Sequence, residues 1–189
     1  IPLEEVFQVL DLDELYRLQW GGRGSGPEYD KTVKETFEPA LKRLKADALK
    51  KGWLKPRAVY GLFPTQSRGN DLVVYDPTAY AKDGSVIELT TFHFPRQEGR
   101  ERLCIADYFR STESSDVDIV AFQIVTVGDD ATRLFEKLQA DGEYTEAYYS
   151  HGLAVEIAEA VAEWLHRQLR YDLGIPPGRG KRYSWGYGA

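Results

Sequence analysis

The spacing of hydrophobic residues changes twice along this chain, and this change limits its possible folds more than any other feature. Apolar residues recur at three- and four-residue intervals over residues 29–51 and 143–171, which predicts amphipathic helices. Between these segments, apolar residues alternate with polar ones or form short runs bounded by turns, which predicts strands. We place the strands at residues 58–63, 72–75, 86–94 and 117–127. Helices, then strands joined by turns, then helices predict an α+β fold with a mostly antiparallel sheet.

The early helices carry one regular apolar stripe and one interruption. The first helix should run from Asp13 to Trp20, with Leu15 and Leu18 facing inward. The second, over residues 29–51, contains Pro39, which lacks a backbone N–H and costs about 3 kcal/mol inside a helix. We therefore expect a kink at this proline, or two helices that abut.

The long helix at residues 143–171 carries a polar stripe beside its apolar one. The polar stripe consists of Glu156, Glu159, Glu163, His166 and Arg170. Such a stripe usually forms a solvated face with ion pairs between neighbouring turns. The chain then turns at Gly174 and returns. An alternative is therefore that Arg182 and this helix face one cleft, where a guanidinium and a carboxylate could recognise a zwitterionic amino acid.

Length, charge and cysteine content exclude several classes of protein. A chain of 189 residues suffices for one domain. Its net charge of −6 argues against general binding to nucleic acid or anionic membranes, and no segment approaches the ~20 apolar residues of a membrane span. The single cysteine, Cys104, has apolar neighbours, so we expect a buried thiol and a reducing, cytoplasmic compartment. Because the chain lacks methionine, we expect a processed chain or a part of a longer polypeptide.

The sequence contains no local motif of a common enzyme class. It has no Walker loop, no strand-linked dinucleotide fingerprint and no GxSxG nucleophile motif. The three histidines, His93, His151 and His166, are dispersed, which argues against a metal site. We expect His93 to be a core residue, because it lies on a strand between aromatic residues. An unrelated enzyme that uses His151 and Glu159 as acid and base is a minor alternative.

The segment from Arg182 to Ala189 offers the best ligand-binding chemistry in the sequence. It contains an arginine, two tyrosines, a tryptophan and two glycines. Arginine can hold a carboxylate through two parallel hydrogen bonds, and aromatic rings can line a flat ligand. The simpler interpretation is an aromatic tail packed on its own domain. A local excess of positive charge from Arg167 to Arg182 could meet an anionic ligand or an acidic partner, or could form a solvated basic face.

Several segments, together and in order, resemble one family. They are PLEEVFQVLDLDELYRLQWGG, RAVYGLFPTQSRGNDLVVY, FHFPRQ, LCIADYF, IAEAVAEWLHRQLR and RYSWGYGA. Nearly end to end, the chain is similar to the activation domain of cobalamin-dependent methionine synthase, the C-terminal module that binds S-adenosylmethionine. The resemblance implies that residues 1–189 form a single α+β domain, curved around a twisted, mostly antiparallel β-sheet flanked by helices, and that this domain is the C-terminal module of a longer chain.

The resemblance also implies where the ligand binds. The family's Arg-x-x-x-Gly-Tyr motif matches Arg182 to Tyr187, so Arg182 would hold the methionyl carboxylate. Backbone groups around Ser184, with Gly186 and Tyr187, would shape the groove. Family members continue past the position of Ala189 and complete the groove there.

A carboxylate for the ligand's ammonium group is implied near the start of the chain. Alignment from the amino end assigns it to Asp11, and alignment back from Trp20 assigns it to Asp13, so both remain open. The family's helix carboxylate near the groove matches Glu159. One turn earlier the family can carry an arginine, where this chain has Glu156, which changes the local charge.

The family's function is to reactivate the synthase. The implied reaction is the reductive methylation of cob(II)alamin to methylcobalamin, with S-adenosylmethionine as methyl donor and flavodoxin or a flavoprotein reductase as electron donor. A cobalamin-binding module of the same or a partner polypeptide would hold the cobalamin, since this chain lacks the Asp-x-His-x-x-Gly motif of the corrinoid module. The domain would act as part of a methyltransferase and have no catalytic side chain of its own. The alternative is a cofactor-free docking module that presents its basic stretch near Arg170 to a flavodoxin-like partner.

Overall fold

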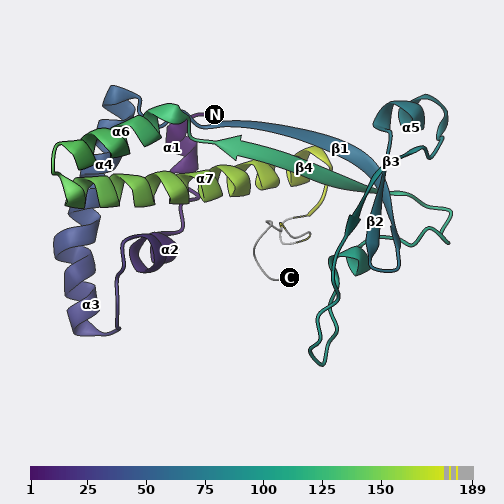
Figure 1. Cartoon of the computed structure of the whole chain (residues 1–189), viewed down its shortest axis with the longest axis horizontal. Coiled ribbons are helices and arrows are strands. Elements are labelled where there is room, and N and C mark those ends of the chain that lie inside the picture. The colour runs from purple at the N-terminus through teal and green to yellow at the C-terminus, as the bar shows by residue number, and fades with distance from the viewer. Residues whose placement is uncertain (177–178, 180–181, 183–189) are drawn as a thin grey trace. The chain divides into compact units, whose positions relative to one another are not determined.

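The computed structural model of the chain describes residues 1–176, Arg179 and Arg182, and the chain divides into two compact units (Figure 1). Among the described residues, the first unit combines Ile1–Val59 with residues 124–176 and Arg179, and the second combines Tyr60–Gln123 with Arg182. That residues 1–189 act as a single domain stays a prediction.

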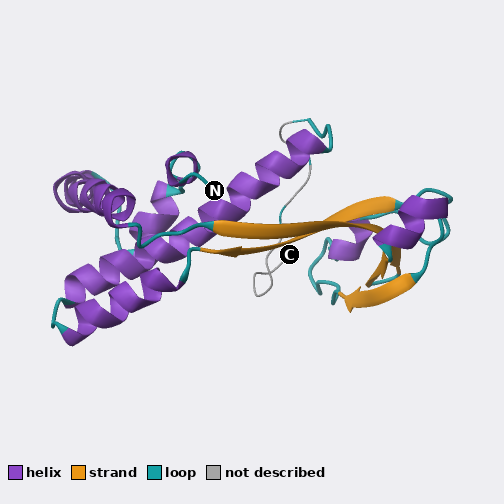
Figure 2. Cartoon of the chain, turned by 90° about the horizontal axis from the view of Figure 1, so that it is seen from above, coloured by secondary structure: helices purple, strands orange, loops and turns teal. Residues whose placement is uncertain are grey.

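The first unit is helical. Its elements are α1 (Leu3–Val6), α2 (Leu12–Glu14), the π-helix η1 (Leu15–Gln19), α3 (Pro27–Thr32), the π-helix η2 (Val33–Phe37), α4 (Glu38–Lys51), α6 (Asp129–Ala140) and α7 (Tyr144–Asp172). The long helix α7 packs along α6, as two views show (Figure 1, Figure 2), and it also contacts α1, η1 and α4. The long helix predicted at residues 143–171 is confirmed, and most of its predicted apolar stripe is buried.

The helix predicted from Asp13 to Trp20 has a wider turn than an α-helix, and this changes which residues it buries. Leu15 is fully buried as predicted, but Leu18 is 71% exposed and Tyr16 is buried instead. The cause is η1, in which the Trp20 N–H donates to the Leu15 carbonyl, five residues back. A π-turn shifts the angular position of each later residue, so a position three residues after Leu15 no longer faces the core.

Pro39 lies at a point of its helix where its missing N–H is tolerated. It lies in the first turn of α4, where the backbone N–H has no partner within the helix. The π-turn η2 precedes it and joins α3 to α4. The backbone keeps right-handed helical angles at Thr32, Phe37 and Glu38, so the helix continues past the proline, and the irregularity is the π-turn directly before it.

Aromatic rings form the centre of this unit's core. Tyr16, Trp20, Phe37 and Tyr149 have ring centroids 4.8 to 6.3 Å apart. The Trp20 indole N–H also donates to the Tyr149 carbonyl at 3.1 Å. Gly152 lets the indole approach α7 closely, since a Cβ at this position would lie 2.8 Å from Trp20 Cδ1. These contacts fix η1, and with it α2, against α7.

The second unit contains most of the β-sheet. Its elements are β1 (Arg57–Arg68), β2 (Asp71–Tyr75), α5 (Pro77–Asp83), β3 (Glu88–His93), the 3-10 helix η3 (Ile105–Tyr108) and β4 (Asp118–Thr126), with the outer ends of β1 and β4 in the first unit. The strand order is β3-β2-β1-β4, and β2 pairs antiparallel with both β1 and β3. The strands predicted at residues 58–63 and 72–75 belong to β1 and β2, which form a hairpin with Arg68 opposite Asp71 across a two-residue turn. The predicted α+β class with a mostly antiparallel sheet is also confirmed.

A buried glutamine ties β1 to the segment before β4. Gln66 is 5% exposed, and its Nε2 donates to the carbonyls of Ser111, Ser114 and Asp116 at 2.9 to 3.3 Å. Its Oε1 accepts a hydrogen bond from the Tyr75 hydroxyl at 3.0 Å. The network satisfies the whole amide group inside the unit, which favours one arrangement of this segment.

His93 is not a core residue, which corrects the sequence prediction. Its side chain is 67% exposed, and its Nδ1 lies 2.6 Å from Asp71 Oδ1. The reason is that β3 is an edge strand of the sheet, so its residues have fewer covering neighbours than the aromatic pattern suggested. The prediction for Cys104 is confirmed, because the thiol is buried and donates to the Phe94 carbonyl at 3.3 Å.

Candidate functional site

Asp11 is held in place by the helix that it caps. It is the N-cap of α2, and its Oδ1 accepts hydrogen bonds from the backbone N–H groups of Asp13 and Glu14, both at 3.0 Å. Because both bonds go to Oδ1, capping leaves the second carboxylate oxygen for a ligand. The sequence therefore places one oriented carboxylate at the start of α2.

Glu156 is buried, which corrects the prediction of a solvated polar stripe along α7. It is 2% exposed, whereas Glu159 and Glu163 on the following turns are only partly buried. Glu156 lies four residues after Gly152 and four before Ala160, and both of these small residues are buried. Residues four apart share a helix face, so this row belongs to the packed side of α7.

The buried Glu156 lies among carboxylates. Burial first, and then the charges of Glu14, Asp11 and Glu159, together raise the pKa of Glu156 to about 7. No hydrogen bond or ion pair to Glu156 occurs within the described part of the chain. The structure thus brings Asp11 and Glu159, the two carboxylates that the resemblance assigns to the ligand, into electrostatic reach of one buried acid.

The remaining predicted ligand residues are at the carboxyl end. Arg182 is described and is partly buried, as is Glu159. Ser184, Gly186 and Tyr187 lie outside the described residues, so their assignments stay predictions.

Asp13, the alternative to Asp11, lies in different surroundings. Its Oδ1 accepts a hydrogen bond from Arg17 Nε at 2.8 Å, and the Arg17 guanidinium lies 4.2 Å from the centroid of the Tyr29 ring. Asp13 is not among the groups that raise the pKa of Glu156. Its carboxylate already has a cationic partner within its own helical segment.

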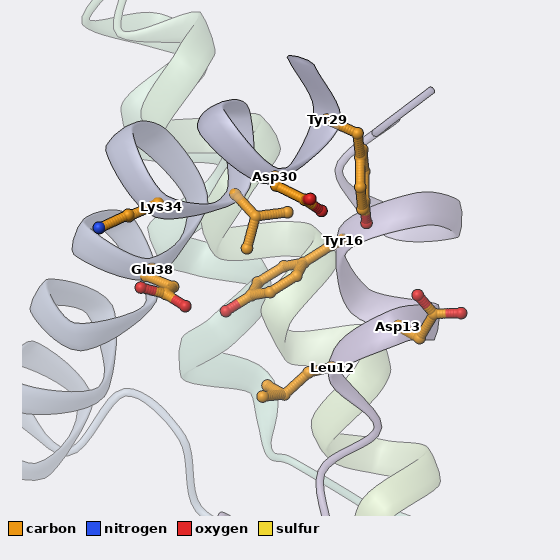
Figure 3. Close-up of a pocket in the computed structure, with 8 residues that line it drawn as sticks. Leu12, Asp13, Tyr16, Tyr29, Asp30, Lys34 and Glu38 are labelled. Atoms are coloured by element: carbon orange, nitrogen blue, oxygen red, sulfur yellow. The ribbon is translucent and has the colours of Figure 1, made fainter. Parts of the chain in front are cut away.

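Asp13 lines an open pocket of about 590 Å³ that is separate from this carboxylate group (Figure 3). The lining residues are Leu12, Asp13, Tyr16, Tyr29, Asp30, Val33, Lys34 and Glu38. Figure 3 shows the Tyr16 hydroxyl directed toward Glu38, and burial followed by the Glu38 charge raises the pKa of Tyr16. Neither Asp11 nor Glu159 lines this pocket.

Two members of the carboxylate group were missed by sequence reasoning. The spacing of Gly152, Glu156 and Ala160 could have indicated that Glu156 is buried. Small residues four positions before and after a helix residue let another element pack closely against that face of the helix. No local signal pointed to Glu14, whose position depends on the packing of η1 and α2 against α7.

Two kinds of feature are absent from the described residues. They contain no group of three or more histidine, cysteine, aspartate or glutamate side chains that could hold a metal ion. They also contain no helix long and apolar enough to cross a membrane.

The same arrangement of helices and antiparallel sheet occurs in a solved structure. A crystal structure of the MetH reactivation domain bound to AdoHcy matches with a TM-score of 0.75 and 23% sequence identity, over 90% of this chain and 53% of that chain. The chain belongs to the family of vitamin B12 dependent methionine synthase activation domains, whose profile matches residues 2–175.

Two full-length relatives are similar over nearly all of this chain. The methionine synthase of Mycobacterium tuberculosis is 34% identical in an alignment of 212 residues that includes 96% of this chain. The methionine synthase of Mycobacterium leprae is 34% identical over 209 residues, which cover 95%. The chain spans 17% of the length of each of these relatives.

Proposed function

We propose that this chain is the S-adenosylmethionine-binding reactivation domain of a cobalamin-dependent methionine synthase, and that it supports the reductive methylation of cob(II)alamin to methylcobalamin. The observation that carries the proposal is the family match over residues 2–175. A protein of the same fold binds AdoHcy, which is the product left when S-adenosylmethionine has donated its methyl group. The two molecules differ only in the methyl group and the charge on the sulfur, so a groove that binds one should accommodate the other.

Each charged group of the ligand has a proposed partner. Arg182 holds the carboxylate through two parallel hydrogen bonds. Asp11 receives the ammonium group, and we favour it over Asp13 because the charge of Asp11 acts on Glu156 of α7, while Asp13 pairs with Arg17. Glu159 adds negative charge to the same site. The groove itself is shaped by Ser184, Gly186 and Tyr187.

In this proposal, the chain contributes to the reaction by holding the methyl group of S-adenosylmethionine in position. The methyl group of S-adenosylmethionine is electrophilic because it is bonded to a positively charged sulfur. Reduced cobalamin on another module would be the nucleophile that takes up this methyl group. The sulfur keeps the bonding electron pair and becomes a neutral thioether, so no side chain of this domain has to accept a proton. Carboxylates near the ligand favour binding of the positively charged donor.

The proposed partners lie outside this chain. They are a cobalamin-binding module of the same or a partner polypeptide and an electron donor, either flavodoxin or a flavoprotein reductase, in the cytoplasm. The relatives are about six times as long as this chain, so they have room for such a module. A second candidate function is a cofactor-free docking module for a flavodoxin-like protein. It is favoured by the excess of positive residues from Arg167 to Arg182.

Calorimetric titration with S-adenosylmethionine tests the proposal. Arg182→Ala should lose about 2–3 kcal/mol of affinity, roughly 30- to 150-fold, because a charged hydrogen-bonding partner is removed. Arg182→Lys should recover only part of this loss, since lysine cannot form the two-pronged contact. Arg167→Ala is the matched control, because Arg167 is exposed and pairs with Glu163. Unchanged affinity in both Arg182 variants would contradict the carboxylate assignment.

A thermal shift distinguishes the two candidate functions. Stabilisation by S-adenosylmethionine, but not by ATP or methionine, supports the reactivation domain. No shift, together with a salt-sensitive complex with flavodoxin, supports the docking module.

A further inference from the structure

We propose that Glu156 is a further ligand-binding carboxylate of this domain, and that it releases its proton to solvent when the ammonium group of the ligand binds beside Asp11. The inference rests on the proposed function, because it requires a ligand that carries an amino-acid ammonium group. It adds one residue and one proton to the binding reaction.

Glu156 has the position and burial of a binding residue. It lies on α7 one turn before Glu159, and residues three apart on a helix lie on neighbouring parts of one face. It is 2% exposed, yet the charges of Asp11 and Glu14, at the start of α2, act on it. The buried acid is thus within reach of both carboxylates proposed to bind the ligand.

No described cation is among the groups that shift the pKa of Glu156. Of the described charged groups on α7 and on the elements around it, some are carboxylates that act on Glu156 and many others are engaged in pairs of their own. The carboxylates that act on it are Asp11, Glu14 and Glu159. The engaged pairs are Arg17–Asp13, Arg43–Glu146, Lys55–Asp130, Arg133–Asp130, Lys137–Asp141, Arg167–Glu163, His166–Glu163 and Glu5–Trp164, and Lys45 lies over the Phe7 ring.

An ionised carboxylate in this position would be costly, so the empty domain keeps Glu156 protonated until the pH approaches neutrality. A buried charge without a partner costs several kcal/mol in real proteins. Burial, and then the three carboxylates, accordingly raise the pKa of Glu156 to about 7. Among the described residues, no cation lowers it.

The ligand's ammonium group is the cation that this cluster lacks. When it binds, the O–H bond of the Glu156 carboxyl breaks and the proton passes to water. The resulting carboxylate then accepts a hydrogen bond from an ammonium N–H, and the ammonium group keeps its own protons. The net result is one proton released for each ligand bound by a molecule whose Glu156 was protonated.

Calorimetry at pH 6 and pH 8 measures the ligand affinity and the number of protons released per ligand. With a pKa of about 7, Glu156 is ionised in about one tenth of the molecules at pH 6 and in about nine tenths at pH 8. The affinity of the wild type for S-adenosylmethionine should therefore be about tenfold higher at pH 8. At pH 6, binding heats in two buffers of different ionisation enthalpy should show the release of nearly one proton per ligand. S-adenosylhomocysteine should behave in the same way, since it keeps the ammonium group and lacks the sulfonium charge.

Two matched variants test whether the proton released on ligand binding comes from Glu156. Glu156→Gln should lack the gain in affinity at pH 8, and the released proton, that Glu156 supplies in the wild type. Glu163→Gln should keep the pH dependence of the wild type, because Glu163 lies on the same helix but already accepts a hydrogen bond from Arg167 at 2.9 Å. Titration of the ligand itself would appear in all three proteins and cancels when they are compared.

The possible outcomes separate this inference from the proposed function. Ligand binding that does not change between pH 6 and pH 8 in the wild type overturns the inference and leaves the proposed function standing. A pH dependence of Glu156→Gln that equals that of the wild type assigns the proton to another group and also overturns the inference. Proton release with S-adenosylmethionine alone overturns the ammonium assignment. Absence of binding in every protein at both pH values rejects the proposed function. If Glu156→Gln fails to fold, the two pH values and the proton count of the wild type still decide.

Discussion

Replacement of Glu156 by glutamine tests the electrostatics of the candidate site without any ligand. Glutamine has nearly the shape of glutamic acid but cannot ionise, and the residue is 2% exposed. In the folded chain its pKa is raised from 4.5 to about 7, first by burial and then by Glu14, Asp11 and Glu159. In the unfolded chain the carboxyl group titrates at its ordinary pKa. Folding above pH 4.5 must therefore either bury a charge or take up a proton.

The size of the effect follows from the difference between the two pKa values. Each pKa unit corresponds to 1.36 kcal/mol, so a rise from 4.5 to about 7 amounts to about 3 kcal/mol. Below pH 4.5 the group is protonated in both states and costs nothing. The cost grows between pH 4.5 and about 7 and is complete above that range. We expect Glu156→Gln to be about 3 kcal/mol more stable than the wild type at pH 8, and equal to it within about 1 kcal/mol at pH 5.

Thermal unfolding followed by circular dichroism at pH 5 and pH 8 measures this difference. For a chain of this length, 3 kcal/mol corresponds to a rise in Tm of about 6–12 °C. Glu163→Gln is the control of opposite sign. Burial alone would raise the pKa of Glu163, but the hydrogen bond from Arg167 and the charges of Arg167 and His166 outweigh it and lower that pKa. Loss of this carboxylate should therefore destabilise the protein at pH 8. A Glu156→Gln variant with a Tm at or below that of the wild type at pH 8 would refute the reasoning.

Three further predictions concern other parts of the structure. Asp11→Ala should lose about 1 kcal/mol of stability with its helix cap and bind S-adenosylmethionine about tenfold more weakly or worse, whereas Asp13→Ala should change stability by less than about 0.5 kcal/mol and leave binding intact. Calorimetry that gives equal losses for both would reject the choice of Asp11. Gly152→Ala should destabilise by about 1–3 kcal/mol in thermal melts, because the new Cβ would lie 2.8 Å from an indole carbon, and a gain in Tm would contradict this contact. Tyr75→Phe should lower the free energy of unfolding in urea by about 1–2 kcal/mol, since its hydroxyl donates to the buried Gln66 amide, and an unchanged midpoint would argue against that bond.

Elements with a clear hydrophobic period could be predicted from the sequence. The helix α7 and the β1–β2 hairpin depend on local spacing and on turn residues, and both occur close to the predicted positions. An irregular helix around Pro39 could also be expected, because a missing N–H limits any helix regardless of its surroundings. Local chemistry decides features of this kind.

Features that depend on packing could not be predicted in this way. Leu18 is exposed because η1 has a π-turn, and no residue pattern in this segment distinguishes a π-turn from an α-turn. Glu156 looked like a surface residue because helix position alone does not tell which face a second element covers. The charge of Asp11 acts on Glu156, which lies about 145 positions further along the chain. Only the fold brings these two residues near each other.

A crystal structure of this chain with S-adenosylhomocysteine would test the proposed site most directly. We expect the ammonium nitrogen about 3 Å from carboxylate oxygens of Asp11 and Glu156, and the ligand carboxylate paired with Arg182. A ligand bound in the pocket lined by Tyr16 and Tyr29, or anywhere else away from Asp11, would contradict it.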